Sequence, residues 1–185
     1  MKLKLTLIIA FSLFTTLVIA QDKKGTLVGV HFTMSDFKSV KSFDQPSTGK
    51  GYSTVRDMAK GISFSYWKGL TSKIDYAVKF NAVQYDYALI NQGISGKKEI
   101  GLELEPNINV HIFPEGARIS PFLTTGAGVG LYNNKIGGFI PAGGGFEFNF
   151  QKIAYLFVQA QYKFTLTKNV LGDNLFYSIG FAQRI

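Results

Sequence analysis

Alternation of apolar and polar side chains with a period of two runs through most of the chain after residue 20. Such a period places the two sets of side chains on opposite faces of a β-strand, whereas an amphipathic helix needs a period of 3.6. The alternating segments follow one another at residues 25–34, 61–68, 74–85, 100–113, 118–132, 139–150, 154–166 and 175–185. The pattern therefore predicts an all-β protein with eight strands.

The predicted connections alternate in length. A long polar stretch at 35–60 and medium loops at 88–99, 133–138 and 167–174 are separated by tight turns at 69–73, 114–116 and 151–152. Short turns at one end and longer loops at the other are typical of outer-membrane barrels. We expect an eight-stranded antiparallel up-and-down transmembrane β-barrel with both termini at the short-turn end, because the number of strands is even.

The first 20 residues have the layout of a cleaved secretory signal peptide. Lys2 and Lys4 precede an apolar run of about sixteen residues that closes with Ala20, and the chain is abruptly polar from Gln21. The run is shorter than the roughly 20 residues that a membrane-spanning helix needs. We expect a signal peptide at 1–20 and one barrel domain at 21–185, exported to the outer membrane of a bacterium with two membranes.

Alternation alone does not separate a membrane barrel from a soluble, lipocalin-like carrier, whose apolar face would point inward. Two features favour an outward apolar face. The apolar faces of the last seven strands lack charged residues, and rows of glycine on the polar faces fit a narrow barrel interior. In addition, alternation up to Ile185 resembles the C-terminal signal that the barrel-assembly machinery reads during insertion. The glycines are Gly126, Gly128, Gly130, Gly143 and Gly145.

Three segments carry a resemblance to a known family. They are FSYWKGLTSKI (64–74), RISPFLTTGAG (118–128) and PAGGGFEF (141–148). In this order they resemble the small outer-membrane β-barrel domain family of Bacteroidetes type, which includes barrels like outer membrane protein A and PorT. The resemblance covers the whole predicted mature chain and implies the barrel fold. Its motifs belong to the fold, and most members of the family have no assigned activity.

The alternation of side chains between the two faces of each strand, which we call strand parity, predicts a polar network inside the barrel. Four acidic and three basic side chains would point inward, and buried charges need partners. Glu103 and Glu105 lie two residues apart on one strand, and Lys79 on the adjacent strand is the expected partner. We expect the network to fill the lumen, and a narrow channel or transport pore is the alternative. The set is Asp75, Lys79, Glu103, Glu105, Glu147, Lys163 and Arg184.

The sequence offers little for catalysis. The chain has no cysteine, which excludes a disulfide, a thiolate metal site and a cysteine nucleophile. We expect His31 near the outer rim and His111 near the inner end, too far apart to share a site. His31 with Ser35 and Asp36 is the one rim cluster that a lipid-modifying enzyme could use. We expect no enzyme, no cofactor and no metal.

The longest loop, 35–60, is the expected site of binding, since loops on a rigid barrel are where binding evolves. It combines aromatic and basic side chains, among them Phe37, Phe43, Tyr52 and Arg56. The expected role is non-enzymatic, structural or binding, with membrane lipid, lipopolysaccharide or an envelope protein as partner. The net charge of +8 is dispersed, so we expect no nucleic acid as partner.

Overall fold

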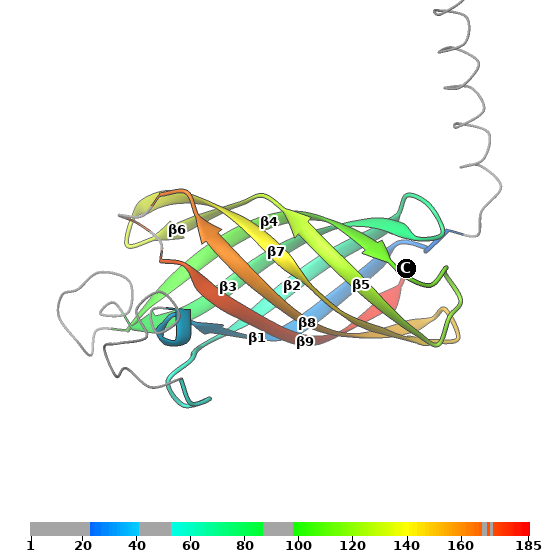
Figure 1. Ribbon diagram of the computed structural model, residues 1–185, viewed down its shortest axis with the longest axis horizontal. Helices are drawn as coiled ribbons and strands as arrows, with labels where there is room; N and C mark the ends of the chain where they lie inside the picture. The colour runs from blue at the N-terminus through cyan, green and yellow to red at the C-terminus, as the bar shows by residue number, and fades with distance from the viewer. Residues whose placement is uncertain (1–22, 41–52, 87–97, 168–169, 171) are drawn as a thin grey trace, which may run out of the picture.

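The computed structural model describes residues 23–40, 53–86, 98–167, 170 and 172–185, and these form a closed antiparallel β-barrel (Figure 1). The predicted signal peptide, 1–20, lies outside these ranges. Among the described residues, no helix is both long and apolar enough to cross a membrane. The strands are β1 (Leu27–Asp36), β2 (Ala59–Gly69), β3 (Ile74–Asp86), β4 (Lys98–His111), β5 (Ile119–Gly126), β6 (Gly128–Tyr132), β7 (Lys135–Phe150), β8 (Ala154–Thr165) and β9 (Asn174–Arg184).

The nine strand labels correspond to eight barrel strands, as predicted. Strands β5 and β6 are two parts of one strand, because both pair with β4 and β7 in a single register. The interruption at Ala127 lies opposite Pro106 of β4, and Pro141 of β7 flanks it on the other side. Proline has no N–H to donate, so the backbone hydrogen bonding of this strand to both β4 and β7 is weakened around Ala127. Pairing of β1 with β9 closes the barrel.

The connections at one end of the barrel are short and those at the other end are longer, as the sequence predicts, with one exception. The turns between β2 and β3, β4 and β5, and β7 and β8 lie at the same end of the barrel as the C-terminus (Figure 1). We call this end the inner end and the opposite one the outer end. The predicted medium loop at 133–138 is wrong, because the chain turns in only two residues, Asn133 and Asn134. Both have positive φ, 47° and 59°, which asparagine tolerates and a two-residue hairpin requires. Strand β7 therefore begins at Lys135, four residues earlier than predicted.

The apolar face points outward and the polar face points inward. Phe64, Leu123 and Phe181 are between 58% and 69% exposed, whereas the polar and charged side chains of the alternate positions are buried. A soluble barrel would have the reverse arrangement, since burial of apolar surface drives its folding. The structure thus confirms the outward apolar face and rules out the lipocalin-like alternative.

Glycine is required where the inward face is most crowded. A Cβ at Gly128 would lie 2.2 Å from the ring of Phe139, and one at Gly180 would lie 2.3 Å from the ring of His31. These separations are below any real carbon contact, so a side chain at either position would displace an aromatic ring. Rows of glycine on the inward face therefore make room for large lumenal rings.

Candidate functional site

The first feature of the lumen is an ion-pair cluster centred on Lys163 of β8. Its ammonium lies 2.6 Å from Glu103 and 2.9 Å from Glu105, both on β4, and all three side chains are buried. Tyr132 donates a hydrogen bond to Glu103, and Asn107 donates one to Glu105 at 2.7 Å. A carboxylate buried in this way is stable only with such donors, because its desolvation is unfavourable. The cluster therefore holds β4, β6 and β8 together across the lumen.

Lys79 is not the ion-pair partner of this cluster, contrary to the prediction. It lies directly opposite Glu105 in the pairing of β3 with β4, but its ammonium extends to the side-chain oxygen of Gln159 on β8. The ammonium also lies 5.4 Å from the ring centroid of Trp67. Strand parity indicates the face of a side chain but not where a long side chain ends, so the sequence did not separate Lys79 from Lys163.

A layer of aromatic rings lies inside the lumen, nearer the inner end than the Lys163 cluster. Trp67 and Phe157 stack with their centroids 4.2 Å apart, and Phe122 contacts Trp67 edge-on at 6.4 Å. His31 belongs to this layer, since its ring lies 6.5 Å from Trp67 and 6.2 Å from Phe157. The four rings therefore pack against one another inside the barrel. The layer therefore separates the polar groups on its two sides.

The predicted position of His31 near the outer rim is wrong. His31 is buried midway along β1, where its Nε2 lies 2.7 Å from the hydroxyl of Ser65. A histidine beside a serine is one element of a nucleophilic site, but a substrate needs access to both groups. The rings of Trp67 and Phe157 contact this histidine inside the barrel, so it cannot form the proposed rim cluster with Ser35 and Asp36.

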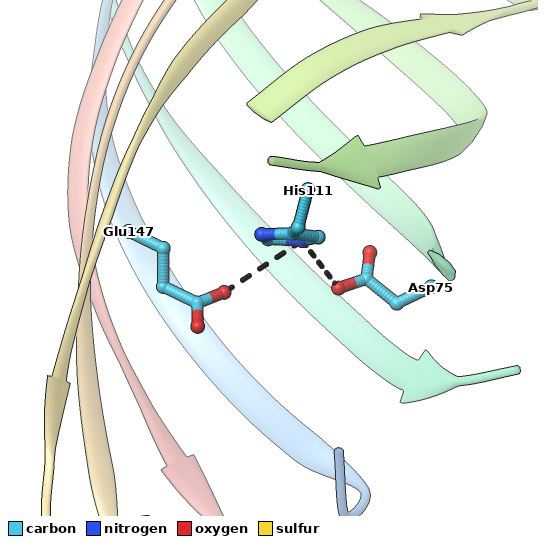
Figure 2. A group of neighbouring side chains, drawn as sticks. All are labelled: Asp75, His111 and Glu147. Carbon is cyan, nitrogen blue, oxygen red and sulfur yellow. Dashed lines mark hydrogen bonds and ion pairs between the residues drawn. The ribbon is translucent and has the colours of Figure 1, made fainter. Parts of the chain in front are cut away.

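A second ionic cluster lies between the aromatic layer and the inner end of the barrel. Asp75 of β3, His111 of β4 and Glu147 of β7 converge there (Figure 2). The Nε2 of His111 lies 2.8 Å from Asp75 and 3.8 Å from Glu147. The ammonium of Lys24, which precedes β1, lies 2.5 Å from Asp75, 3.3 Å from His111 and also pairs with Glu147. We call these four residues the inner cluster.

Lys24 is the member of the inner cluster that sequence reasoning missed. It lies before the first alternating segment, so no strand parity applied to it. Its side chain is 3% exposed, and its ammonium lies within 6.0 Å of the ring centroids of Trp67, Tyr155 and Phe157. A lysine just before the first strand, at the end where carboxylates face inward, was the signal available in the sequence.

The structure places six of the seven predicted network residues inside the barrel. Arg184 is the exception, because it is the last residue of β9 and is exposed at the inner end of the barrel. Its parity is inward, but the strand ends there and leaves the side chain in the opening. The buried six are Asp75, Lys79, Glu103, Glu105, Glu147 and Lys163.

The predicted binding loop is divided between buried and exposed residues. Phe37 is only 2% exposed and packs with Val83, Tyr85 and Phe139 at the outer end of the lumen. It therefore caps the barrel and offers no surface to a partner, contrary to the prediction. Phe43 and Tyr52 lie outside the described residues. Arg56 is exposed.

The described part of the same loop is held by local hydrogen bonds. Asp36 accepts bonds from the backbone N–H groups of Lys38 and Ser39, at 2.9 and 3.0 Å, and so begins a helical turn. Asp57 accepts bonds from the backbone and hydroxyl of Thr54, which lower the pKa of its carboxyl. These contacts order the two described ends of the loop.

No family model matches the chain and no curated protein matches its sequence, whereas solved structures match its fold. Neisserial surface protein A has a TM-score of 0.58 at 11% identity, with 89% of this chain and 100% of that one covered. The N-terminal barrel domain of Pseudomonas aeruginosa OprF has a TM-score of 0.53 at 12% identity, covering 88% and 98%. This chain has the fold of the small outer-membrane β-barrels.

A third similar structure is of Ail, the attachment invasion locus protein of Yersinia pestis, in complex with the heparin analogue sucrose octasulfate. Its TM-score is 0.53 at 13% identity, with 88% of this chain and 99% of that one covered. The similarity to each of the three barrels therefore extends over nearly the whole of both chains. At identities this low, it concerns the fold and not the ligand.

Proposed function

We propose that this protein is a non-enzymatic outer-membrane barrel with a closed lumen, which acts through its outer end as a structural or binding element of the cell envelope. The observation that carries the proposal is the filling of the lumen by two ion-pair clusters with an aromatic layer between them. A pore needs a continuous aqueous path, and an enzyme needs a cleft that admits substrate. The lumen serves to hold the barrel.

Membrane lipid and lipopolysaccharide are the proposed contacts of the outer end. Arg56, Lys60 and Lys135 are exposed there, on the loop after β1, at the start of β2 and at the start of β7. Lys60 lies on the outward face, at the end opposite the periplasmic turns. Phosphate groups of lipopolysaccharide are anions that such side chains bind by charge-assisted hydrogen bonds.

A binding experiment tests this role. The folded barrel in detergent micelles is titrated with lipopolysaccharide, and the variant R56A/K60A/K135A is compared with the wild type. We expect the triple variant to bind at least fivefold more weakly, and more so at low salt. The matched control is K68A/K73A/R118A, which removes three exposed charges at the inner end. Equal weakening of both variants would mean that only net charge matters and would contradict the proposal.

Conductance across a planar bilayer tests the closed lumen. We expect the folded wild-type protein to give no steady openings at 100 mV, because the aromatic layer blocks the lumen. The variant W67A/F157A removes the two stacked rings and should conduct if it folds. Steady wild-type openings that disappear on changing Glu105→Gln would contradict the proposal and favour the narrow channel.

A further inference from the structure

We propose that Asp75, His111 and Glu147 form a binding site for a divalent transition-metal ion of the zinc type, and that the ammonium of Lys24 acts as a tethered cation that competes for it. Metal and ammonium would be alternative occupants of the same place in the inner cluster. The proposal does not depend on what the outer loops bind.

The ligand set and its geometry are the first argument. One imidazole nitrogen and two carboxylate oxygens, contributed by three strands, lie within 4.8 Å of one another (Figure 2). Zn²⁺ binds these donors at about 2.0–2.2 Å, which places neighbouring ligand atoms of a tetrahedron roughly 3.4 Å apart. The separations of 2.8 and 3.8 Å from His111 to Asp75 and Glu147 bracket that value. Small rotations of the side chains would therefore complete the site.

The orientation of Asp75 is the second argument. Its second oxygen accepts a hydrogen bond of 2.7 Å from the side-chain amide of Asn109, two residues from His111 on β4. This bond leaves the other oxygen directed to the centre of the cluster. Metal sites commonly use such outer hydrogen bonds to fix the orientation of a ligand.

The position of Lys24 is the third argument. Its ammonium contacts all three candidate ligands. A cation, the ammonium of Lys24, therefore already occupies the place where the lone pairs of the three ligands converge. With the imidazole of His111 neutral, which is the form that binds a metal, the two carboxylates carry two negative charges, of which one ammonium compensates only one. A divalent ion would compensate both, and an unbalanced buried charge is unfavourable.

Access to the cluster is the fourth argument. Lys24 precedes β1, and its side chain is a flexible stem that can turn towards the inner opening. A hollow of about 10 Å³ adjoins the cluster and is lined by Lys24, the three ligands and residues of two inner turns. That volume is close to what one water needs. The hollow therefore leaves space for one small occupant beside the ligands, on the side of the inner turns.

Zinc titration of the tag-free mature chain, folded in detergent micelles, tests the proposal. The variants are the wild type, K24M, and K24M/H111Q, each followed by isothermal titration calorimetry with ZnCl₂ at pH 7.5. We expect K24M to bind one Zn²⁺ per chain at least tenfold more tightly than the wild type. Addition of H111Q should weaken the binding at least tenfold. Equal zinc affinity of K24M and K24M/H111Q would overturn the proposal, as would the absence of binding by K24M.

Folding of K24M is checked by its gel mobility before and after boiling. If K24M does not fold alone, it is refolded with ZnCl₂ and, separately, with MgCl₂. Recovery with zinc only, lost in K24M/H111Q, would support the site, because magnesium prefers an all-oxygen octahedral shell. Failure to recover with zinc would overturn the proposal.

Discussion

At the residue scale, the sequence predicts which side chains face the lumen and not which of them meet. Alternation correctly places Glu103 and Glu105 inside, because a strand has only two faces. Their partner is Lys163 rather than Lys79, since a long side chain can cross the lumen instead of pairing with its nearest neighbour. The predicted position of His31 is wrong because the position of a residue along the barrel axis depends on strand tilt. Lys24 is missed because it lies outside the strands, where alternation gives no information.

Lys163→Met should destabilise the barrel strongly. It removes the cation between Glu103 and Glu105 and leaves two buried carboxylates close together. Loss of one partner of a buried ion pair costs about 3–5 kcal/mol. Urea unfolding in lipid vesicles measures the change, and the single tryptophan, buried Trp67, reports the transition.

The matched control is Lys68→Met, which changes an exposed lysine and should alter the unfolding free energy by no more than about 0.5 kcal/mol. Equal unfolding free energies of the two variants would contradict the importance of the Lys163 cluster. In the background of K163M, changing Glu103→Gln should recover part of the loss, since it removes one uncompensated charge.

Gly180→Ala should destabilise the barrel by about 1–3 kcal/mol, the usual effect of overpacking. The added Cβ would lie 2.3 Å from the ring of His31, which the aromatic layer holds in place. Gly138→Ala is the matched control, because the nearest atom there is 3.7 Å away. The same urea titration compares them, and a G138A loss as large as that of G180A would refute the role of lumenal crowding.

At the element scale, eight strands were predictable because alternation is a local signal that repeats along the chain. Two details depended on neighbouring strands and were not predicted. Pro106 and Pro141 are distant in sequence but flank the same point, where one strand divides into β5 and β6. The predicted loop at 133–138 is a two-residue hairpin, since Gly137 and Gly138 extend the ladder with β6.

Asn134→Val should destabilise the hairpin between β6 and β7 by about 1–2 kcal/mol, and Asn134→Gly should be neutral or stabilising. Asn134 has φ of 59°, a conformation that is unfavourable for a β-branched residue and easy for glycine. Urea unfolding of both variants measures the difference. Valine tolerated as well as glycine would contradict the turn geometry.

At the scale of the whole molecule, composition and alternation together predicted a barrel with its apolar face outward. The sequence could not predict the packing of the lumen with the same detail, because that packing depends on where the side chains of Trp67, Phe157 and the lysines end in three dimensions. The structure has an apolar exterior, charged clusters inside and its three longest connections at the outer end. This arrangement is suited to a lipid bilayer and would be unstable as a soluble monomer.

Electrophoresis of the outer-membrane fraction of expressing cells, with unheated and boiled samples, tests the central claim most directly. A closed membrane barrel keeps its fold in detergent until it is boiled, so we expect the protein in this fraction and a change of mobility on boiling. Recovery of the protein from the soluble periplasm, with the same mobility before and after boiling, would contradict the account.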